Sequence, residues 1–157
     1  MIFRQIFDSV SSTYTYLIAS GRGREALIID PVLEKVDQYI NLLNQLDLKL
    51  VKVIDTHIHA DHISAAPFLK SKLGGKIGIG ENITKVQNLF GDVFNEKENF
   101  ARNGSQFDQL FSDGDKFSLG ELDCVVLHVP GHTPADLAFI IGNVAFVGDT
   151  LFMPDYG

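Results

Sequence analysis

Four side chains that commonly bind metal ions lie within six consecutive positions: His57, His59, Asp61 and His62. Imidazole nitrogens bind zinc, iron and other first-row metal ions, and a carboxylate adds an oxygen ligand that offsets the charge of the ion. A packed core is a poor place for these four side chains, because each would need a polar partner there. A solvated, histidine-rich loop is the alternative interpretation of this segment taken alone. The pattern favours a metal site.

Two further segments carry the same kinds of ligand. His132 lies in the sequence Pro-Gly-His-Thr at 130–133, and Asp149 lies in Gly-Asp-Thr at 148–150. Each segment follows a predicted strand, so each ligand is expected on a loop at a strand end. Loops held by a rigid scaffold often build a site in this way. Together with the first segment, they predict six side chains that converge around a common metal site.

The element that must position the histidine cluster is a strand at residues 50–55, whose β-branched apolar sequence is typical of a buried strand. The cluster begins almost directly after this strand. Residues two apart on an extended chain point the same way, so His57 and His59 can bind one ion together. The turn that follows can direct Asp61 and His62 to a neighbouring position.

The rest of the apolar pattern predicts an α/β sandwich with helices on its outer faces. A helix is expected to begin at Pro31, with an apolar face formed by Val32, Val36, Tyr39, Ile40, Leu43 and Leu46. Two more helices are predicted at 63–73 and 82–90, and a long loop at 91–114. The other strands are predicted at 14–18, 25–30, 76–80, 116–119, 122–129, 137–141 and 144–148. The pair Gly142-Asn143 is typical of a hairpin turn.

The composition argues against several classes of partner. The chain of 157 residues has a formal net charge of −7 and no basic cluster, so a nucleic acid partner is not expected. No stretch approaches the roughly 20 apolar residues that a membrane-spanning helix needs, and the polar start of the chain is unlike a signal peptide. Cys124 is the one cysteine, which excludes an internal disulfide and fits a reducing compartment. We therefore expect a cytoplasmic protein without a membrane partner.

The three ligand-bearing segments resemble the signature motifs of the metallo-β-lactamase superfamily. THIHADH at 56–62 resembles its HxHxDH motif, PGHT its second histidine motif and GDT its bridging-aspartate motif. Residues 103–115, 129–139 and 147–157 further resemble the persulfide dioxygenase (sulfur dioxygenase) branch, which neighbours the glyoxalase II thiolester hydrolases. The resemblance runs from about Thr13 to the last residue.

The resemblance implies a metallo-β-lactamase-type αββα sandwich. Residues 1–157 would form a single domain of this type that is incomplete at its C-terminus, and so the N-terminal part of the sandwich. Members of the superfamily continue through a second half that supplies a further histidine ligand and much of the substrate pocket, whereas this chain ends at Gly157. We therefore expect the chain to be a portion of a longer protein.

For the dioxygenase branch, the resemblance implies a single Fe(II) ion bound by His57, His132 and Asp149, which would be the catalytic residues. A set of two histidines and one carboxylate leaves three positions for water, thiol substrate and O2. The reaction would oxidise glutathione persulfide, or a related low-molecular-weight persulfide, to sulfite. The expected partner is thus a small thiol or persulfide.

For the hydrolase branch, the resemblance implies two zinc ions. The first would be bound by His57, His59 and His132. The second would be bound by Asp61 and His62 and bridged to the first by Asp149. A metal-bound hydroxide would then attack a thiolester carbonyl.

A third possibility belongs to another class of function. The chain could be an inactive metal-binding fragment that works by pairing with another chain. Exposed apolar surface and open sheet edges favour association, so a homo-oligomer is also possible.

Two residues outside the motifs are candidates for binding substrate. Arg102 could pair with a substrate carboxylate, or could be one charge on a solvated loop. Tyr156, together with Asp155, could approach the substrate or lie on a surface loop.

Four more residues are expected to support the site or the core. Thr56 and Thr133 flank ligands and could orient a histidine. His128 is expected to have a structural or supporting role rather than to bind the metal. Cys124 lies in an apolar strand and is expected to act as a small buried hydrophobe.

Overall fold

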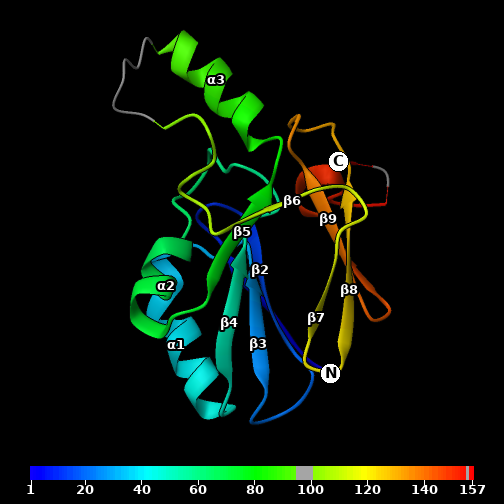
Figure 1. Ribbon diagram of the computed structural model, residues 1–157. Coiled ribbons are helices and arrows are strands. Elements are labelled where there is room, and N and C mark those ends of the chain that lie inside the picture. Colours follow the sequence, from blue (N-terminus) through cyan, green and yellow to red (C-terminus); the bar gives the residue numbers. More distant parts are fainter. Residues whose placement is uncertain (95–100, 155) are drawn as a thin grey trace.

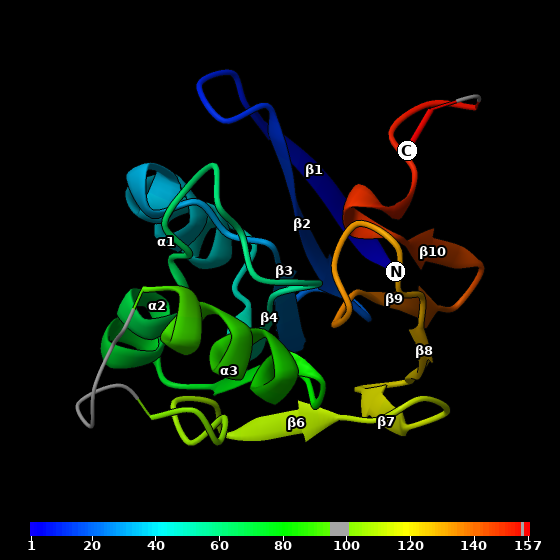
Figure 2. The ribbon, with the colours of Figure 1, turned by 90° about the horizontal axis from the view of Figure 1, so that it is seen from above.

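Two β-sheets pack face to face, and helices cover the outer face of the larger sheet (Figures 1 and 2). The computed structural model describes residues 1–94, 101–154 and 156–157. Within them the larger sheet has the order β1-β2-β3-β4-β5-β6, formed by Ile2–Asp8, Thr13–Ala19, Glu25–Ile29, Lys49–Ile54, Lys76–Gly80 and Gln109–Phe111. The smaller sheet has the order β10-β9-β8-β7, formed by Val144–Phe146, Leu137–Ile141, Leu122–His128 and Lys116–Leu119. The helices are α1 (Val36–Gln45), α2 (Ala66–Leu73) and α3 (Ile83–Val93).

The larger sheet is parallel where it carries the histidine cluster. Strands β3, β4, β5 and β6 pair in parallel, and each of the three helices connects two neighbouring strands of this set. Ligands in such sheets commonly bind at the carboxyl ends of the strands. The chain leaves the carboxyl end of β4 directly before His57, so the cluster lies at this edge.

Alternating residues of the central strands supply two hydrophobic layers. In β3, Ala26 and Ile28 pack in the layer between the sheet and helices α1 and α2. Leu27 and Ile29 pack in the layer between the two sheets, together with Phe139 of the smaller sheet. Side chains in a strand point to opposite faces in turn, so a strand covered on both faces has a continuous apolar sequence.

Most of the predicted elements are confirmed, as is the α/β class. The structure has a strand in each of the predicted strand segments, and α1 buries Val36, Tyr39 and Leu43 of the predicted apolar face. Strands β9 and β10 form the predicted hairpin, and Gly142 has the positive φ angle of 60° that this turn requires.

Several element boundaries were predicted wrongly. Pro31 does not open a helix, because Val32 first pairs with Ser64 and a short 3-10 turn, Leu33–Lys35, precedes α1. The helix predicted at 63–73 begins at Ala66, with Pro67 in its first turn, where a missing N–H is tolerated.

The segments predicted as a loop and as the last strand also need correction. Within 91–114, α3 continues to Val93 and the short strand β6 follows later; residues 95–100 lie outside the described part of the chain. Strand β10 ends at Phe146 instead of residue 148, and the 3-10 turn Gly148–Thr150 follows it. Strand β1 was missed, because its sequence IFRQIFD places apolar residues in adjacent pairs instead of alternating them with polar ones. It lies at the edge of the sheet.

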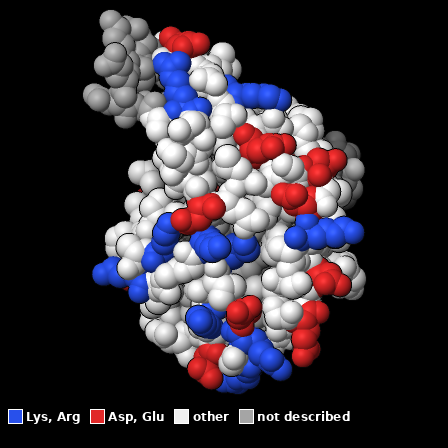
Figure 3. All heavy atoms as spheres, in the orientation of Figure 1, with Lys and Arg blue, Asp and Glu red and all other residues white. Residues whose placement is uncertain are grey.

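The charges on the surface and the length of the helices relate to two partners considered above, nucleic acids and membranes. The face in Figure 3 intersperses Lys and Arg with Asp and Glu. None of the helices in the described part of the chain has the length and apolar character needed to cross a membrane.

We predict that Leu27→Ala lowers the free energy of unfolding by about 2–5 kcal/mol, because it leaves a cavity between the two sheets. Urea denaturation measures this change. Val10→Ala is the matched control, since Val10 is 93% exposed, and its effect should stay within about 0.5 kcal/mol. Equal effects of the two substitutions would contradict the assignment of Leu27 to the core.

Candidate metal centre

The three predicted ligand segments meet at one end of the two sheets. His57 Nε2 lies 3.7 Å from Asp149 Oδ2, and His132 Nε2 lies 3.4 Å from the same oxygen. Potential ligand atoms of these three residues all lie within 4.8 Å of one another. The structure therefore brings together one residue from each segment, as two histidines and one carboxylate.

The other three predicted ligands form a second cluster beside the first. His62 Nδ1 lies 3.1 Å from Asp61 Oδ2, and His59 Nδ1 lies 3.9 Å from Asp61 Oδ1. The rings of His57 and His59 connect the clusters, with centroids 4.2 Å apart. All six predicted residues thus lie in one region, and Asp149, rather than His59, groups with His57 and His132.

Asp30 connects the two clusters, through Thr56 beside His57 and directly through His59. It follows β3, is buried, and has a φ angle of 50°, a conformation that aspartate tolerates better than most residues. Its carboxylate accepts hydrogen bonds from the N–H of Thr56 at 2.7 Å, the hydroxyl of Thr56 at 2.9 Å and Nε2 of His59 at 3.1 Å. One side chain therefore orients residues on both sides of His57.

The hydrogen bond between Asp30 and His59 changes the pKa of both groups. Burial favours a neutral Asp30, but the hydrogen bond and charge of His59 outweigh it and lower the pKa of Asp30. Burial also favours a neutral His59, but the hydrogen bond and charge of Asp30 raise the pKa of His59 to about 9. Because Nε2 of His59 donates to Asp30, Nδ1 is the nitrogen that remains to bind a metal ion.

Thr56 fixes the orientation of the His57 ring. Its hydroxyl donates to Asp30, so its oxygen can accept the Nδ1–H of His57 at 3.0 Å. This arrangement leaves Nε2 of His57 to face Asp149. A Cβ atom at Gly148 would collide with the Thr56 side chain, and Gly148 has a φ angle of 51°. A glycine before Asp149 is therefore needed for both space and backbone conformation.

Asp136 shapes the loop that carries His132. Its carboxylate accepts the hydroxyl of Thr133 at 2.5 Å and the N–H of Thr133 at 2.7 Å. His128 supports the same loop, because its Nε2 lies 3.0 Å from the carbonyl oxygen of Pro134 and 3.1 Å from Asn82 Nδ2. These contacts fit the structural role expected for His128 and give Thr133 a role in fixing the loop.

The hairpin between β1 and β2 reaches the second cluster through Thr13. The Thr13 hydroxyl lies 3.1 Å from Asp61 Oδ2 and 3.2 Å from His62 Nδ1. Ser11 Oγ lies 2.9 Å from both Thr13 Oγ1 and Asp8 Oδ2, so the contact continues along the hairpin. The oxygens of Thr13 and Asp61 contact Nδ1 of His62 and leave Nε2, its other ring nitrogen, for a different partner.

The unpaired nitrogen of His62 is the test of whether these residues fit a metal ion. Nε2 of His62 is buried and has no hydrogen-bond partner among the described residues. A buried imidazole nitrogen without a partner is costly unless a ligand satisfies it. Thr56 contacts Nδ1 of His57, so Nε2 of this ring can bind another partner. Asp30 contacts Nε2 of His59, so Nδ1 of this ring can do the same. The residues therefore fit a bound metal ion.

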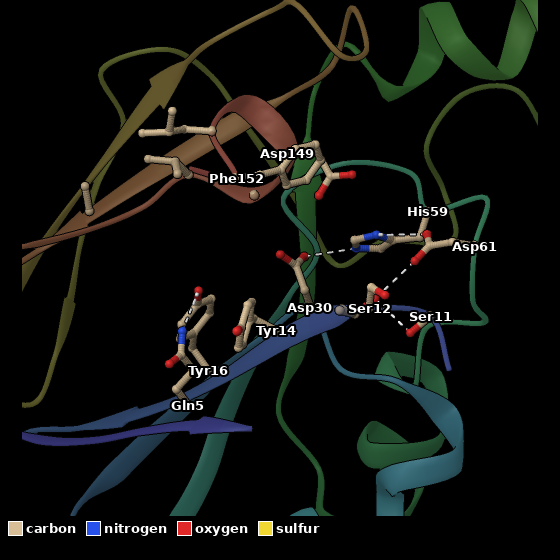
Figure 4. A pocket seen from close by; sticks show the side chains of 15 residues that line it. Gln5, Ser11, Ser12, Tyr14, Tyr16, Asp30, His59, Asp61, Asp149 and Phe152 are labelled. Atoms are coloured by element: carbon tan, nitrogen blue, oxygen red, sulfur yellow. Dashed lines mark hydrogen bonds and ion pairs between the residues drawn. The ribbon is translucent and has the colours of Figure 1, made fainter. Parts of the chain in front are cut away.

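A cavity of about 750 Å³, shown in Figure 4, opens beside the clusters. Gln5, Tyr14 and Tyr16 from β1 and β2 lie on one side of it, and Asp149 and Phe152 lie on the other. Asp30, His59 and Asp61 also line this cavity. We call it the polar cavity, and its lining includes members of both clusters, Asp149 of the first and His59 and Asp61 of the second.

The substrate roles considered for Arg102 and Tyr156 stay predictions. Arg102 pairs with Asp92 at 2.6 Å, and Tyr156 is exposed and forms a backbone bridge with Met153. Asp155 lies outside the described residues. Cys124 is buried, and burial raises the pKa of its thiol to about 11, which fits the expected inert hydrophobe.

Sequence reasoning missed Asp30, Asp136 and Thr13. The sequence held a signal for Asp30, because a carboxylate directly after an apolar strand lies at a strand end, as the histidine cluster does. That strand, β3, pairs with β4, which precedes the histidine cluster. Asp136 and Thr13 act through contacts that only the folded chain creates.

We predict that Asp30→Ala weakens zinc binding by about 10–100-fold, because His59 loses its partner and Thr56 loses its anchor. Competition with a chromophoric chelator measures the affinity, and far-UV circular dichroism checks that the variant is folded. Asp30→Asn, which keeps the shape, should fall between Asp30→Ala and the parent chain. Asp37→Ala, an exposed position on α1, is the control; an equal loss there would refute the role of Asp30.

We predict that Thr13→Val selectively weakens the binding of zinc to the cluster of His59, Asp61 and His62, by about tenfold or more. The substitution keeps the side-chain shape and removes the hydroxyl that contacts Asp61 and His62. A zinc titration that resolves two binding steps measures it. Thr13→Ser restores the hydroxyl and should bind like the parent chain; equal weakening in both variants would count against the hydrogen bond.

Comparisons with known proteins agree with this geometry. The sequence profile of the metallo-beta-lactamase superfamily matches residues 8–157. A probable metallo-hydrolase of Burkholderia pseudomallei (strain 1710b) is 41% identical over 178 residues, which cover 100% of this chain and 60% of that protein. The mitochondrial persulfide dioxygenase ETHE1 of Homo sapiens is 33% identical over 159 residues, which cover 100% of this chain and 55% of that protein.

A solved structure shares the fold. The crystal structure of ETHE1 from Myxococcus xanthus is similar with a TM-score of 0.81 and 38% sequence identity, over 98% of this chain and 59% of that chain. This chain therefore spans 55% to 60% of the length of these three relatives. The family and the fold expected from the motifs are confirmed: the chain belongs to the metallo-β-lactamase superfamily, in its branch of ETHE1 and glyoxalase II-like proteins.

Proposed function

We propose that this protein is a persulfide dioxygenase that oxidises glutathione persulfide, or a related low-molecular-weight persulfide, with O2. The observation that carries the proposal is the cluster of His57, His132 and Asp149, with both Nε2 atoms within 3.7 Å of one Asp149 oxygen. Two histidines and one carboxylate are the ligand set of many non-haem Fe(II) oxygenases. The similarity to human ETHE1 and to ETHE1 from Myxococcus xanthus supports the same function.

The overall reaction balances with O2 as the oxidant and water as the further reactant. A persulfide R–S–SH, O2 and H2O give R–SH, hydrogen sulfite and a proton. The S–S bond breaks, the outer sulfur becomes sulfite, and the two sulfur atoms together lose four electrons to O2. An Fe(II) ion bound by this ligand set supplies open coordination positions for sulfur and O2.

The protein residues prepare the ligands for this chemistry. Asp30 and Thr56 hold the two ring nitrogens that face away from the centre, so His57 and His59 each keep a defined orientation. Asp149 supplies a negative charge beside two imidazoles, which offsets the charge of a divalent cation. The polar cavity then admits the substrate to this side of the centre.

A dinuclear zinc thiolester hydrolase is the second candidate function. The cluster of His59, Asp61 and His62 favours it, because these residues could bind a second ion next to the first. The probable metallo-hydrolase of Burkholderia pseudomallei, at 41% identity, supports the same alternative.

Metal content and O2 uptake test the proposal on protein isolated without added ions. We expect about one iron ion per chain and O2 consumption that depends on glutathione persulfide and yields sulfite. Asp61→Asn should keep iron and most of the O2 uptake, whereas Asp149→Asn should lose both. Both substitutions remove one carboxylate charge, so they are a matched pair.

Three outcomes would contradict the proposal. About two zinc ions per chain, thiolester hydrolysis and its loss in Asp61→Asn would establish the hydrolase instead. Iron without O2 uptake in any persulfide assay would refute the dioxygenase. Bound metal without turnover of either substrate class would favour an inactive metal-binding protein.

A further inference from the structure

We propose that Asp8 positions His62 for metal binding through two hydroxyl groups that lie between them. The hydroxyls belong to Ser11 and Thr13, at the hairpin between β1 and β2, and we call them the hydroxyl pair. The inference goes beyond the proposed function, because it concerns the second cluster and does not depend on the reaction that the centre catalyses. Asp8 is a positioning residue that acts through its neighbours, and not a ligand.

The hydroxyl pair connects the Asp8 carboxylate to the His62 ring in three contacts. Ser11 Oγ lies 2.9 Å from Asp8 Oδ2 and 2.9 Å from Thr13 Oγ1. Thr13 Oγ1 in turn lies 3.2 Å from Nδ1 of His62. These distances are within hydrogen-bonding range. Asp8 is the last residue of β1 and pairs with Thr13, so strand pairing holds the carboxylate beside the hydroxyl pair.

Asp8 is a well-fixed acceptor at the end of this connection. It is buried, and its Oδ2 also accepts the N–H of Ser11 at 2.9 Å. Its other oxygen lies 3.4 Å from Nζ of Lys35, in the 3-10 turn before α1. The hydrogen bonds from Ser11, and then Lys35, lower the pKa of Asp8. Asp8 is therefore ionised at neutral pH, and an ionised acceptor forms stronger hydrogen bonds than a neutral one.

The hydroxyl pair has two consistent directions, because each hydroxyl has only one hydrogen to donate. In the first direction, Ser11 donates to Thr13, and Thr13 donates to Asp61 Oδ2 at 3.1 Å. In the second direction, Thr13 donates to Ser11, and Ser11 donates to Asp8. Asp8 and Asp61 thus compete for the same two hydrogens.

A metal ion on His62 favours the second direction. An ion bound at the buried, unpaired Nε2 leaves the proton of the ring on Nδ1, which then needs an acceptor. Asp61 Oδ2 lies 3.1 Å from Nδ1, but an ion bound by Asp61 competes for this carboxylate. The oxygen of Thr13 can accept the Nδ1–H if Thr13 donates to Ser11. The hydrogen bonds of the ring then end on Asp8.

A role in the turn alone does not account for these contacts. The bond from the N–H of Ser11 to Asp8 would suffice to stabilise the turn, whereas the Ser11 hydroxyl also lies between Asp8 and Thr13. Ser12, between the two hydroxyls in sequence, has a φ angle of 59°, which serine adopts at an energetic cost. The turn is therefore held in a strained conformation that brings the hydroxyl pair together.

Zinc titration of the chain and its variants tests the inference. Ser11→Ala keeps the N–H bond to Asp8 and removes the hydroxyl. It should weaken the second zinc-binding step about three- to tenfold, less than loss of a direct partner of a ligand, and leave the first step unchanged within about twofold. Ser11→Thr should restore the affinity. Ser9→Ala is the matched control, because Ser9 is exposed in the same turn.

A double-mutant cycle tests whether Asp8 acts through the hydroxyl pair. Asp8→Ala should weaken the second zinc-binding step, and adding Ser11→Ala should weaken it no further, because the connection is already broken. Far-UV circular dichroism checks that each variant is folded. Weakening by the product of the two single effects would show that Asp8 and Ser11 act independently, and would overturn the inference.

Nuclear magnetic resonance of the zinc-loaded chain reads the His62 ring directly. We expect the proton on Nδ1 and slow exchange of this proton with water, and faster exchange in Ser11→Ala but not in Ser9→Ala. A proton on Nε2 in the zinc-loaded chain would overturn the inference. So would equal zinc affinities of Ser11→Ala and Ser9→Ala, failure of Ser11→Thr to restore binding, or a chain that binds no second zinc ion.

Discussion

The buried carboxylate of Asp30 is the constraint on which the metal centre depends. A buried charge is unfavourable unless donors surround it, and Asp30 has three, from Thr56 and His59. Those donors exist only because β3 and β4 pair in parallel, with the N–H of Asp30 bonded to the carbonyl oxygen of Ile54 at 2.9 Å. The pairing of β3 with β4 thus supplies the hydrogen-bond donors of Asp30, and Asp30 in turn orients the rings of His57 and His59. The geometry of the metal ligands therefore depends on the pairing of these two strands.

The features encoded by neighbouring residues could be predicted from the sequence, whereas the contacts between distant residues could not. Short-range patterns such as HxHxDH and the Gly142-Asn143 turn encode ligand types and strand ends directly, so both were predicted. The contact between Asp30 and Thr56 joins residues 26 positions apart and depends on strand register. Strand β1 was missed because its apolar residues come in adjacent pairs without the alternation typical of a half-buried strand, and β6 because a short strand leaves almost no periodic signal. The packing of Ile83 and Val86 of α3 against Ala135, after the His132 loop, likewise joins distant parts of the chain and has no local sequence signal.

The charges around the centre explain why it is built for a cation. Asp30, Asp61 and Asp149 lie near the histidines. Without a metal ion, a proton on His59 offsets part of their negative charge, because the nearby carboxylates raise its pKa to about 9. A metal ion bound at Nδ1 of His59 would replace the proton on that nitrogen, so we expect metal binding to release a proton at neutral pH. The hydrogen bond from Nε2 to Asp30 can persist in both states, because it uses the other nitrogen. The protein can therefore exchange a proton for an ion without rebuilding the site.

Whether one or two ions bind is decided by how the same six ligands are divided. Asp149 lies within 3.7 Å of both His57 and His132, and Thr56 and Asp136 hold the loops of these two histidines. Asp61 is 46% exposed and depends on Thr13 of the β1–β2 hairpin for its hydrogen bond. Each cluster combines buried and exposed ligands: the side chains of His57, His59 and His62 are 2%, 6% and 3% exposed, whereas those of His132, Asp61 and Asp149 are 45%, 46% and 36% exposed. A ligand held through an exposed hairpin loses more conformational entropy on binding an ion than a ligand fixed by buried contacts. Occupancy of the second cluster should therefore depend on the position of the hairpin, through the contacts of Thr13 with Asp61 and His62.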